Sequence, residues 1–153
     1  MLRIVPKSLF NWTFKIFQGG QPIAVIDRSM VREAGELILE EAYYKLYREG
    51  LINGRYLLER DDAIVAWAEK PSAFRNVFEV NYGEQRYVLK KKSAFLRLFL
   101  LELEGRTVGT MRPVRAFTRT AEADFPDHLP VAVQVFMVWL VLILWKRASD
   151  GAS

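Results

Sequence analysis

The chain has 153 residues, of which 51% are hydrophobic, and its 22 Lys and Arg against 18 Asp and Glu give a formal net charge of +4 at pH 7. This length suits one domain with a sizeable core, and so small a basic excess does not by itself indicate nucleic-acid binding. The chain has no cysteine, which excludes disulfides, thiolate nucleophiles and cysteine metal sites. Because no signal peptide is recognisable at the N-terminus, we expect a cytoplasmic protein that meets membranes only peripherally.

Apolar and polar residues alternate in the first part of the chain. Trp12, Phe14 and Ile16 share one parity, which predicts a strand. Gly19-Gly20 predicts a turn, and residues 23–27 form the expected returning strand. The tripeptide beginning at Gly19, Gly-Gly-Gln, also occurs as a catalytic motif in translation release factors. Here it lies between two apparent strands, so it indicates a hairpin turn.

Segment 29–42 is compatible with a helix or with strands. Apolar residues at helical spacing define one face of a helix that Ser29 would cap. The alternative is a pair of strands, 35–39 and 43–47, joined by a short connection. Gly35 inside a helix costs about 1 kcal/mol relative to alanine, and the tyrosines of the second segment favour a strand. We favour strands.

An internal repeat supports this choice. When the chain is shifted by about 43 residues, Tyr44 aligns with Tyr87, and Leu-Leu-Glu at 57–59 aligns with the same tripeptide at 100–102. Each copy has the pattern strand, turn, strand, tight turn, strand. The tight turns are Asp61-Asp62 and Glu104-Gly105. Two unrelated β meanders of similar length would share part of this pattern.

Further strands are predicted at 74–82 and, as a last edge strand, at 115–120. The total is about eleven or twelve short strands with few long loops, a pattern that is typical of a sandwich or a barrel.

The chain ends with an apolar stretch from Leu129 to Trp145 that carries no charge. It predicts a helix over about 127–147, with Asp127 as its cap and Pro130 in its first turn. Lys146 and Arg147 follow it directly, where cations favour a helix C-terminus. A helix that is apolar on every side must be enclosed by lipid or by protein.

A lipid environment and a protein environment make different demands on this stretch. Its 17 residues span about 26 Å as a helix, slightly less than a hydrocarbon core of about 30 Å. Acidic residues before it and cations after it would place the first part of the chain outside the cell, although nothing at the N-terminus directs export. Trp139 and Trp145 are too close together for opposite membrane interfaces. In a protein core, their N–H groups are expected to find backbone acceptors. We favour a closed sheet around the helix.

The layout resembles the tubby C-terminal-like superfamily, which includes the LURP-one-related proteins and the phospholipid scramblases. The segments AEKPSAFRNVFEVNYGEQRYVLKKKSAF, GRTVGTMRP and DHLPVAVQVFMVWLVLILWKR look like a bacterial group associated with this fold, and the resemblance covers roughly Trp12 to Arg147. It implies a mainly β fold with one C-terminal helix: a closed antiparallel barrel of about twelve strands enclosing a central hydrophobic helix, as a single domain over 1–153. Tubby proteins bind phosphoinositides through basic side chains and scramblases carry an acidic calcium-binding segment. Neither motif aligns here, so no ligand residue is carried over.

Signals for an enzyme are weak. The single histidine, His128, has no evident partner for catalysis or metal binding and is interpreted as a polar residue at the start of the helix. Asp61-Asp62 is interpreted as a turn. No nucleophile elbow, phosphate loop or zinc spacing is present. The sequence therefore predicts no catalytic residue, no metal ligand and no cofactor.

Basic residues provide the strongest functional signal. If the strand ends that carry them meet in space, they form an anion-binding patch for an anionic phospholipid or a phosphoinositide; the alternative is a solvated surface. No aromatic–basic stacking motif for nucleic acid is present. We expect a non-enzymatic binding or scaffold module. The alternatives are a single-pass membrane protein anchored by the apolar helix and, with least support, an enzyme; the oligomeric state is left open. The candidate residues are Lys90, Lys91, Lys92, Arg97, Arg112, Arg115 and Arg119.

Overall fold

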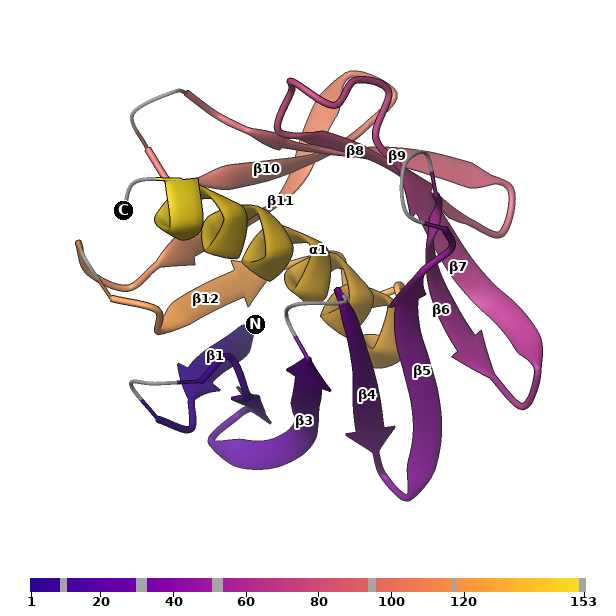
Figure 1. The fold of residues 1–153 in the computed structure, drawn as a ribbon, viewed down its shortest axis with the longest axis vertical. Helices are drawn as coiled ribbons and strands as arrows, with labels where there is room; N and C mark the ends of the chain where they lie inside the picture. The colour runs from indigo at the N-terminus through magenta and orange to yellow at the C-terminus, as the bar shows by residue number, and fades with distance from the viewer. Residues whose placement is uncertain (9–10, 30–32, 51–53, 94–95, 117, 152–153) are drawn as a thin grey trace.

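The structure is a computed structural model that describes residues 1–153 except 9–10, 30–32, 51–53, 94–95, 117 and 152–153, and except the side chains of 28 and 29. Within the described residues, 12 antiparallel strands close into a barrel around one helix, α1 (Val131–Gly151) (Figure 1). The predicted fold class, a closed twelve-stranded barrel that encloses a hydrophobic helix, is confirmed.

The strands follow one another around the barrel in chain order, and β1 closes the ring by pairing with β12. Closure removes the free edges that an open sheet of this size would present. The bounds are β1 Leu2–Pro6, β2 Phe14–Gln18, β3 Gln21–Ser29, β4 Ala34–Leu39, β5 Ala42–Arg48, β6 Tyr56–Arg60, β7 Ala63–Glu69, β8 Val77–Tyr82, β9 Gln85–Lys91, β10 Phe99–Leu103, β11 Arg106–Pro113 and β12 Ala121–Asp124.

The two ends of the barrel differ in how the strands are joined. At one end, here called the turn end, hairpins reverse within two residues, at 19–20, 40–41, 61–62, 83–84 and 104–105. Most of these residues have positive φ, for example 47° at Glu40 and 68° at Glu41. Two-residue turns of this kind match the right-handed twist of the flanking strands. At the other end, the loop end, the connections are longer, and α1 finishes there.

The internal repeat has a physical basis in the barrel. The paired strands shift register by a β-bulge at Ile16/Phe17, at Leu58/Glu59 and at Leu101/Glu102, all on the approach to a tight turn. These bulged hairpins, β2–β3, β6–β7 and β10–β11, alternate with the regular hairpins β4–β5 and β8–β9. The aligned segments of the repeat are β5–β7 and β9–β11, and the first bulged hairpin extends the pattern toward the N-terminus. Bulges increase local twist and help a sheet to curve.

The ambiguous segment 29–42 contains strand β4, as favoured above, while positions 30–32 lie outside the described residues. Leu37 is fully buried between the exposed residues Glu36 and Ile38. This two-residue period belongs to a strand with one face on the core. Glu40 and Glu41 then form the turn into β5.

Helix α1 forms the centre of the core. Each residue from Ala132 to Trp145 is buried, and its length and composition would suffice to cross a membrane, although most of it is enclosed by the barrel. Burying each large apolar side chain stabilises the fold by about 1.5–3 kcal/mol. Gln134 is the buried polar residue of this core in the described chain. Its amide donates to the carbonyl oxygens of Leu129 at 2.9 Å and Pro126 at 3.3 Å.

The predicted helix bounds and helix cap were wrong. The helix covers Val131–Gly151 rather than 127–147, and Asp127 lies in a turn before it. The Pro130 carbonyl accepts the N–H groups of Val133 at 2.9 Å and Gln134 at 3.0 Å, so the first helical hydrogen bonds start there. At the other end the helix continues past the apolar stretch, and Lys146 pairs with Asp150 one turn later.

The expectation for the tryptophan N–H groups was also wrong. Trp139 and Trp145 are core residues, as favoured, but the Nε1 atoms of both are buried without a hydrogen-bond partner among the described residues. Ring packing holds Trp139 instead: its centroid lies 5.9 Å from that of Tyr56 and 6.0 Å from that of Phe136. Aromatic pairs at such distances contribute about 0.5–1.5 kcal/mol beyond their buried area.

Gly109→Ala is expected to lower the free energy of unfolding by about 1–3 kcal/mol. Gly109 is buried in β11, and an added Cβ would lie 2.7 Å from the Asp124 carbonyl oxygen and 2.9 Å from Phe125 Cδ1. The control is Gly151→Ala, where no atom lies within 4 Å of the added Cβ. Denaturant unfolding of both variants measures the difference, and equal midpoints would contradict the prediction.

Candidate functional site

An open groove of about 820 Å³ lies at the loop end, beside the last turns of α1. Its walls come from the segment before β2, the β9–β10 loop, the β11–β12 loop and the helix. Trp12, Leu96 and Trp145 provide apolar surface, and three arginines face the same space. The sequence predicted these arginines, Arg97, Arg115 and Arg119, as anionic-ligand candidates, and the structure brings them together.

Two of the three arginines also hold the loops in place. Arg97 donates to the Thr118 carbonyl oxygen at 2.7 Å, and its guanidinium lies 5.1 Å from the Trp145 ring centroid. Arg119 donates to the carbonyl oxygens of Asn11 at 2.5 Å and of Ser8, and lies 5.1 Å from the ring centroid of Trp12. Partial burial lowers the pKa of both guanidinium groups from its ordinary value, but arginine stays charged in proteins.

The remaining candidates lie outside the groove. Lys90 points along the outer wall, where its Nζ is 3.0 Å from a carboxylate oxygen of Glu102 on β10. Arg112 is likewise paired across strands, 3.4 Å from Glu122. Lys91 is the last residue of β9 and Lys92 follows it at the loop end; their backbone N–H groups donate to the carbonyl oxygens of Asn76 and Leu98, respectively. The seven residues therefore do not form one patch. Three line the groove, two lie at the loop end outside it, and Lys90 and Arg112 form ion pairs on the barrel wall.

Charge is separated along the barrel axis. The two-residue turns contain six acidic residues and no basic ones: Glu40, Glu41, Asp61, Asp62, Glu84 and Glu104. Five connections at the loop end, 7–13, 49–55, 70–76, 92–98 and 114–120, contain eight basic residues and one acidic one, and the sixth, 30–33, adds one of each. The basic residues of the five are Lys7, Arg55, Lys70, Arg75, Lys92, Arg97, Arg115 and Arg119. The sequence carried this signal, but it becomes visible only when connections are sorted by barrel end.

A second cluster at the loop end was missed by the sequence analysis. Glu33 accepts hydrogen bonds from Arg147 at 2.7 Å, from Arg48 at 3.3 Å and from the Tyr56 hydroxyl at 3.1 Å. Arg147 also donates to the Tyr56 hydroxyl at 2.8 Å. These contacts join the β3–β4 connection, β5, β6 and the end of α1. A cavity of about 290 Å³ opens next to them, and Lys70 contributes to its wall.

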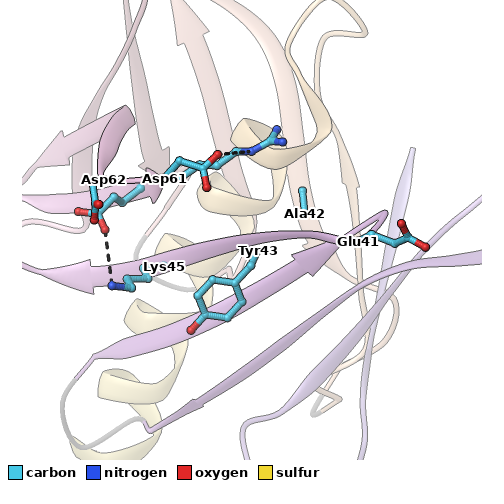
Figure 2. Close-up of a pocket in the computed structure, with 8 residues that line it drawn as sticks. Glu41, Ala42, Tyr43, Lys45, Asp61 and Asp62 are labelled. Atoms are coloured by element: carbon cyan, nitrogen blue, oxygen red, sulfur yellow. Dashed lines mark ion pairs between the residues drawn. The ribbon is translucent and has the colours of Figure 1, made fainter.

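The turn end has an acidic depression of about 410 Å³ (Figure 2). Asp61 and Asp62 form the tight turn that the sequence predicted. Figure 2 shows Glu41 pointing away from both aspartates. Asp61 is 3.5 Å from Arg60, and Lys45 is 3.9 Å from Glu59. Among the described residues, no group of three or more histidines and carboxylates is placed to hold a metal ion.

His128 lies in the turn before α1, and its Nε2 is 3.2 Å from the Tyr87 hydroxyl at the turn end. It is thus remote from the arginine groove. Comparisons of the chain with protein-family models, with curated proteins and with solved structures find no match.

Tyr56→Phe is expected to make stability less sensitive to alkaline pH. Burial, followed by the charge of Glu33, raises the pKa of the Tyr56 hydroxyl. Above about pH 10, the unfolded state therefore binds fewer protons than the folded state, and stability falls as pH rises. The variant lacks this contribution, although Tyr87, Tyr47 and Tyr43, whose pKa values are also raised, retain theirs. Denaturant unfolding from about pH 9 to about pH 11 tests this, and parallel pH curves for the two proteins would contradict it.

Proposed function

We propose that the protein is a non-enzymatic binding module that recognises anionic lipid headgroups, of a phospholipid or a phosphoinositide, at a membrane surface through the loop end of the barrel. The observation that carries this is the groove in which Arg97, Arg115 and Arg119 meet Trp12 and Trp145. Each basic residue near an anionic membrane contributes about 1 kcal/mol to attraction. Trp12 is partly exposed, and a tryptophan side chain of this kind, with an apolar body and a polar N–H group, favours the interface between lipid and water. Trp145 is a buried core residue.

Two apolar residues in loops at the loop end support the proposal. Phe74 is 99% exposed and Leu96 is 51% exposed. Each is held by a serine turn: the Phe74 N–H donates to the Ser72 hydroxyl and the Leu96 N–H to the Ser93 hydroxyl, both at 3.2 Å. Their loops, β7–β8 and β9–β10, flank the β8–β9 hairpin and lie at the same end. Exposed apolar residues at the same end as basic residues suit a surface that enters the headgroup region.

We also propose that the chain belongs to the tubby C-terminal-like superfamily and acts in the cytoplasm at the membrane periphery. A closed barrel around one helix supports the first of these, although a fold does not fix a function. The anchored alternative would require α1 to leave the barrel that encloses it, and no specific observation favours it. An enzyme likewise has no supporting site among the described residues.

Sedimentation with vesicles tests the proposal. Wild type is expected to bind vesicles that contain phosphatidylglycerol and not neutral phosphatidylcholine vesicles. Lys92→Gln combined with Arg115→Gln is expected to weaken binding by about tenfold or more, because two cations at the loop end are lost. The control, Lys15→Gln with Arg106→Gln, removes the same charge from the β2 wall and the turn end. An equal loss in both double variants would mean that only net charge matters and would contradict a loop-end site.

Phe74→Ser is expected to weaken binding to the same vesicles by about tenfold, since burying a phenylalanine side chain is worth about 1.5–3 kcal/mol. Added salt should leave this difference in place while it reduces the electrostatic part of binding. The matched control is Ile64→Ser, because Ile64 on β7 is 46% exposed near the turn end. Unchanged binding by the Phe74 variant would show that this tip stays in water.

A further inference from the structure

The cavity of about 290 Å³ at the loop end, here called the basic pocket, is lined by Arg48, Tyr56, Glu69, Lys70, Ala73 and Arg147, together with Gly54. It lies beside the Glu33 cluster and apart from the groove that contains Arg97. Its lining brings three cations from three different elements, namely β5, the β7–β8 loop and α1, around one small space. Cavities near this size hold small ligands in many proteins.

Three cations line the basic pocket, and two carboxylates lie close to them, Glu33 beside the pocket and Glu69 in its lining. Glu33 forms ion pairs with Arg48 at 3.3 Å and with Arg147 at 2.5 Å, and Glu69 is the one carboxylate among the lining residues. Lys70 forms no ion pair within the described part of the chain. Burial lowers the pKa of its ammonium group, and the neighbouring Arg147 and Arg48 lower it further against the opposing effect of Glu33. A partly buried lysine beside two guanidinium groups is electrostatically unfavourable unless an anion joins them.

We propose that the basic pocket binds a phosphate monoester, with Lys70 and Arg147 as its charged donors and the Tyr56 hydroxyl at its side. A monoester carries a charge of about −1.5 to −2 near neutral pH and offers three acceptor oxygens. Guanidinium forks and a lysine ammonium match that acceptor set. The cavity exceeds a bare phosphate in size, which leaves room for a small organic group. This site goes beyond the proposed membrane function and does not depend on it.

The monoester has two physical sources. One is a small soluble phosphorylated compound. The other is the headgroup of a lipid such as phosphatidic acid, because Ala73 lines the pocket and its neighbour Phe74 is the exposed loop tip. Either source brings negative charge to Lys70.

Isothermal titration calorimetry of the full chain with inorganic phosphate and with glycerol 3-phosphate, at low salt, tests the site. Saturable binding is expected for wild type and for the control Lys15→Gln. Lys70→Gln should bind about tenfold more weakly, whereas Lys70→Arg should retain binding. The melting temperature of Lys70→Gln should not fall, because an unfavourable charge is removed; a lower melting temperature with unchanged phosphate affinity would indicate a structural role and overturn the proposal.

Vesicles separate the two sources. If the monoester belongs to a lipid, wild type prefers vesicles with phosphatidic acid over those with phosphatidylglycerol, and Lys70→Gln loses that preference. Calorimetric binding without such a preference indicates a soluble ligand. Vesicle binding without saturable binding of any phosphate monoester, free or in phosphatidic acid, rejects the basic pocket and leaves the membrane function standing. If the protein binds a phosphate monoester in calorimetry but binds no vesicles of any composition, the basic pocket is supported and the membrane function is rejected.

Discussion

Enclosure of α1 is the constraint on which the rest of this structure depends. A helix that is apolar on every face gains its stabilising free energy only if its whole circumference is removed from water. An open sheet would leave one face bare, so the ring has to close, and it does so through the short pairing of Leu2, Arg3 and Ile4 with β12. The first and last strands thus depend on each other and on the helix. The terminal elements are part of the core rather than accessories to it.

Enclosure also explains why the two barrel ends are unlike. The chain reaches α1 from the turn end, and the helix finishes at the loop end among arginines such as Arg97 and Arg147. A helix carries partial positive charge at its N-terminus and partial negative charge at its C-terminus. Acidic turns around the helix start and basic loops around its end complement that dipole. The same separation gives the molecule one face that attracts anions, so the charge pattern serves both the fold and the proposed binding.

Strand parity and turn residues predicted most of the strands, because each hairpin alternates inward and outward residues between residues that favour tight turns. The last strand was misplaced: it was predicted at 115–120 and lies at Ala121–Asp124. The strands alone were compatible with a sandwich or a barrel, and the apolar helix, which needs to be enclosed, favoured the barrel. Hydrophobicity did not locate the ends of α1, because hydrophobicity indicates which residues are buried. The start of the helix is set by hydrogen bonds that the Pro130 carbonyl oxygen accepts. Arg97, Arg115 and Arg119 could be predicted to meet because they belong to neighbouring loops. Lys90 and Arg112 could not be separated from them without strand register, which pairs them with Glu102 and Glu122. The cations of the basic pocket, Arg48, Lys70 and Arg147, come from elements that are far apart in the sequence, and no local pattern signals that they meet.

The loop end divides its cations between two tasks. Arg97, Arg119 and Arg147 donate to Thr118, to Ser8 and Asn11, and to Glu33, so each ties a loop or the helix end to the barrel. Removing any of them alters stability along with charge, and a loss of binding would then have two explanations. Lys70, Lys92 and Arg115 form no ion pair in the part of the chain that the structure describes, although the Lys70 ammonium group lies 6.0 Å from the Phe78 ring centroid. Cations without an ion-pair partner repel the other cations of the loop end and destabilise the fold slightly. Repulsion of that kind is relieved when an anion arrives, which makes these three residues the ones through which binding can be separated from folding.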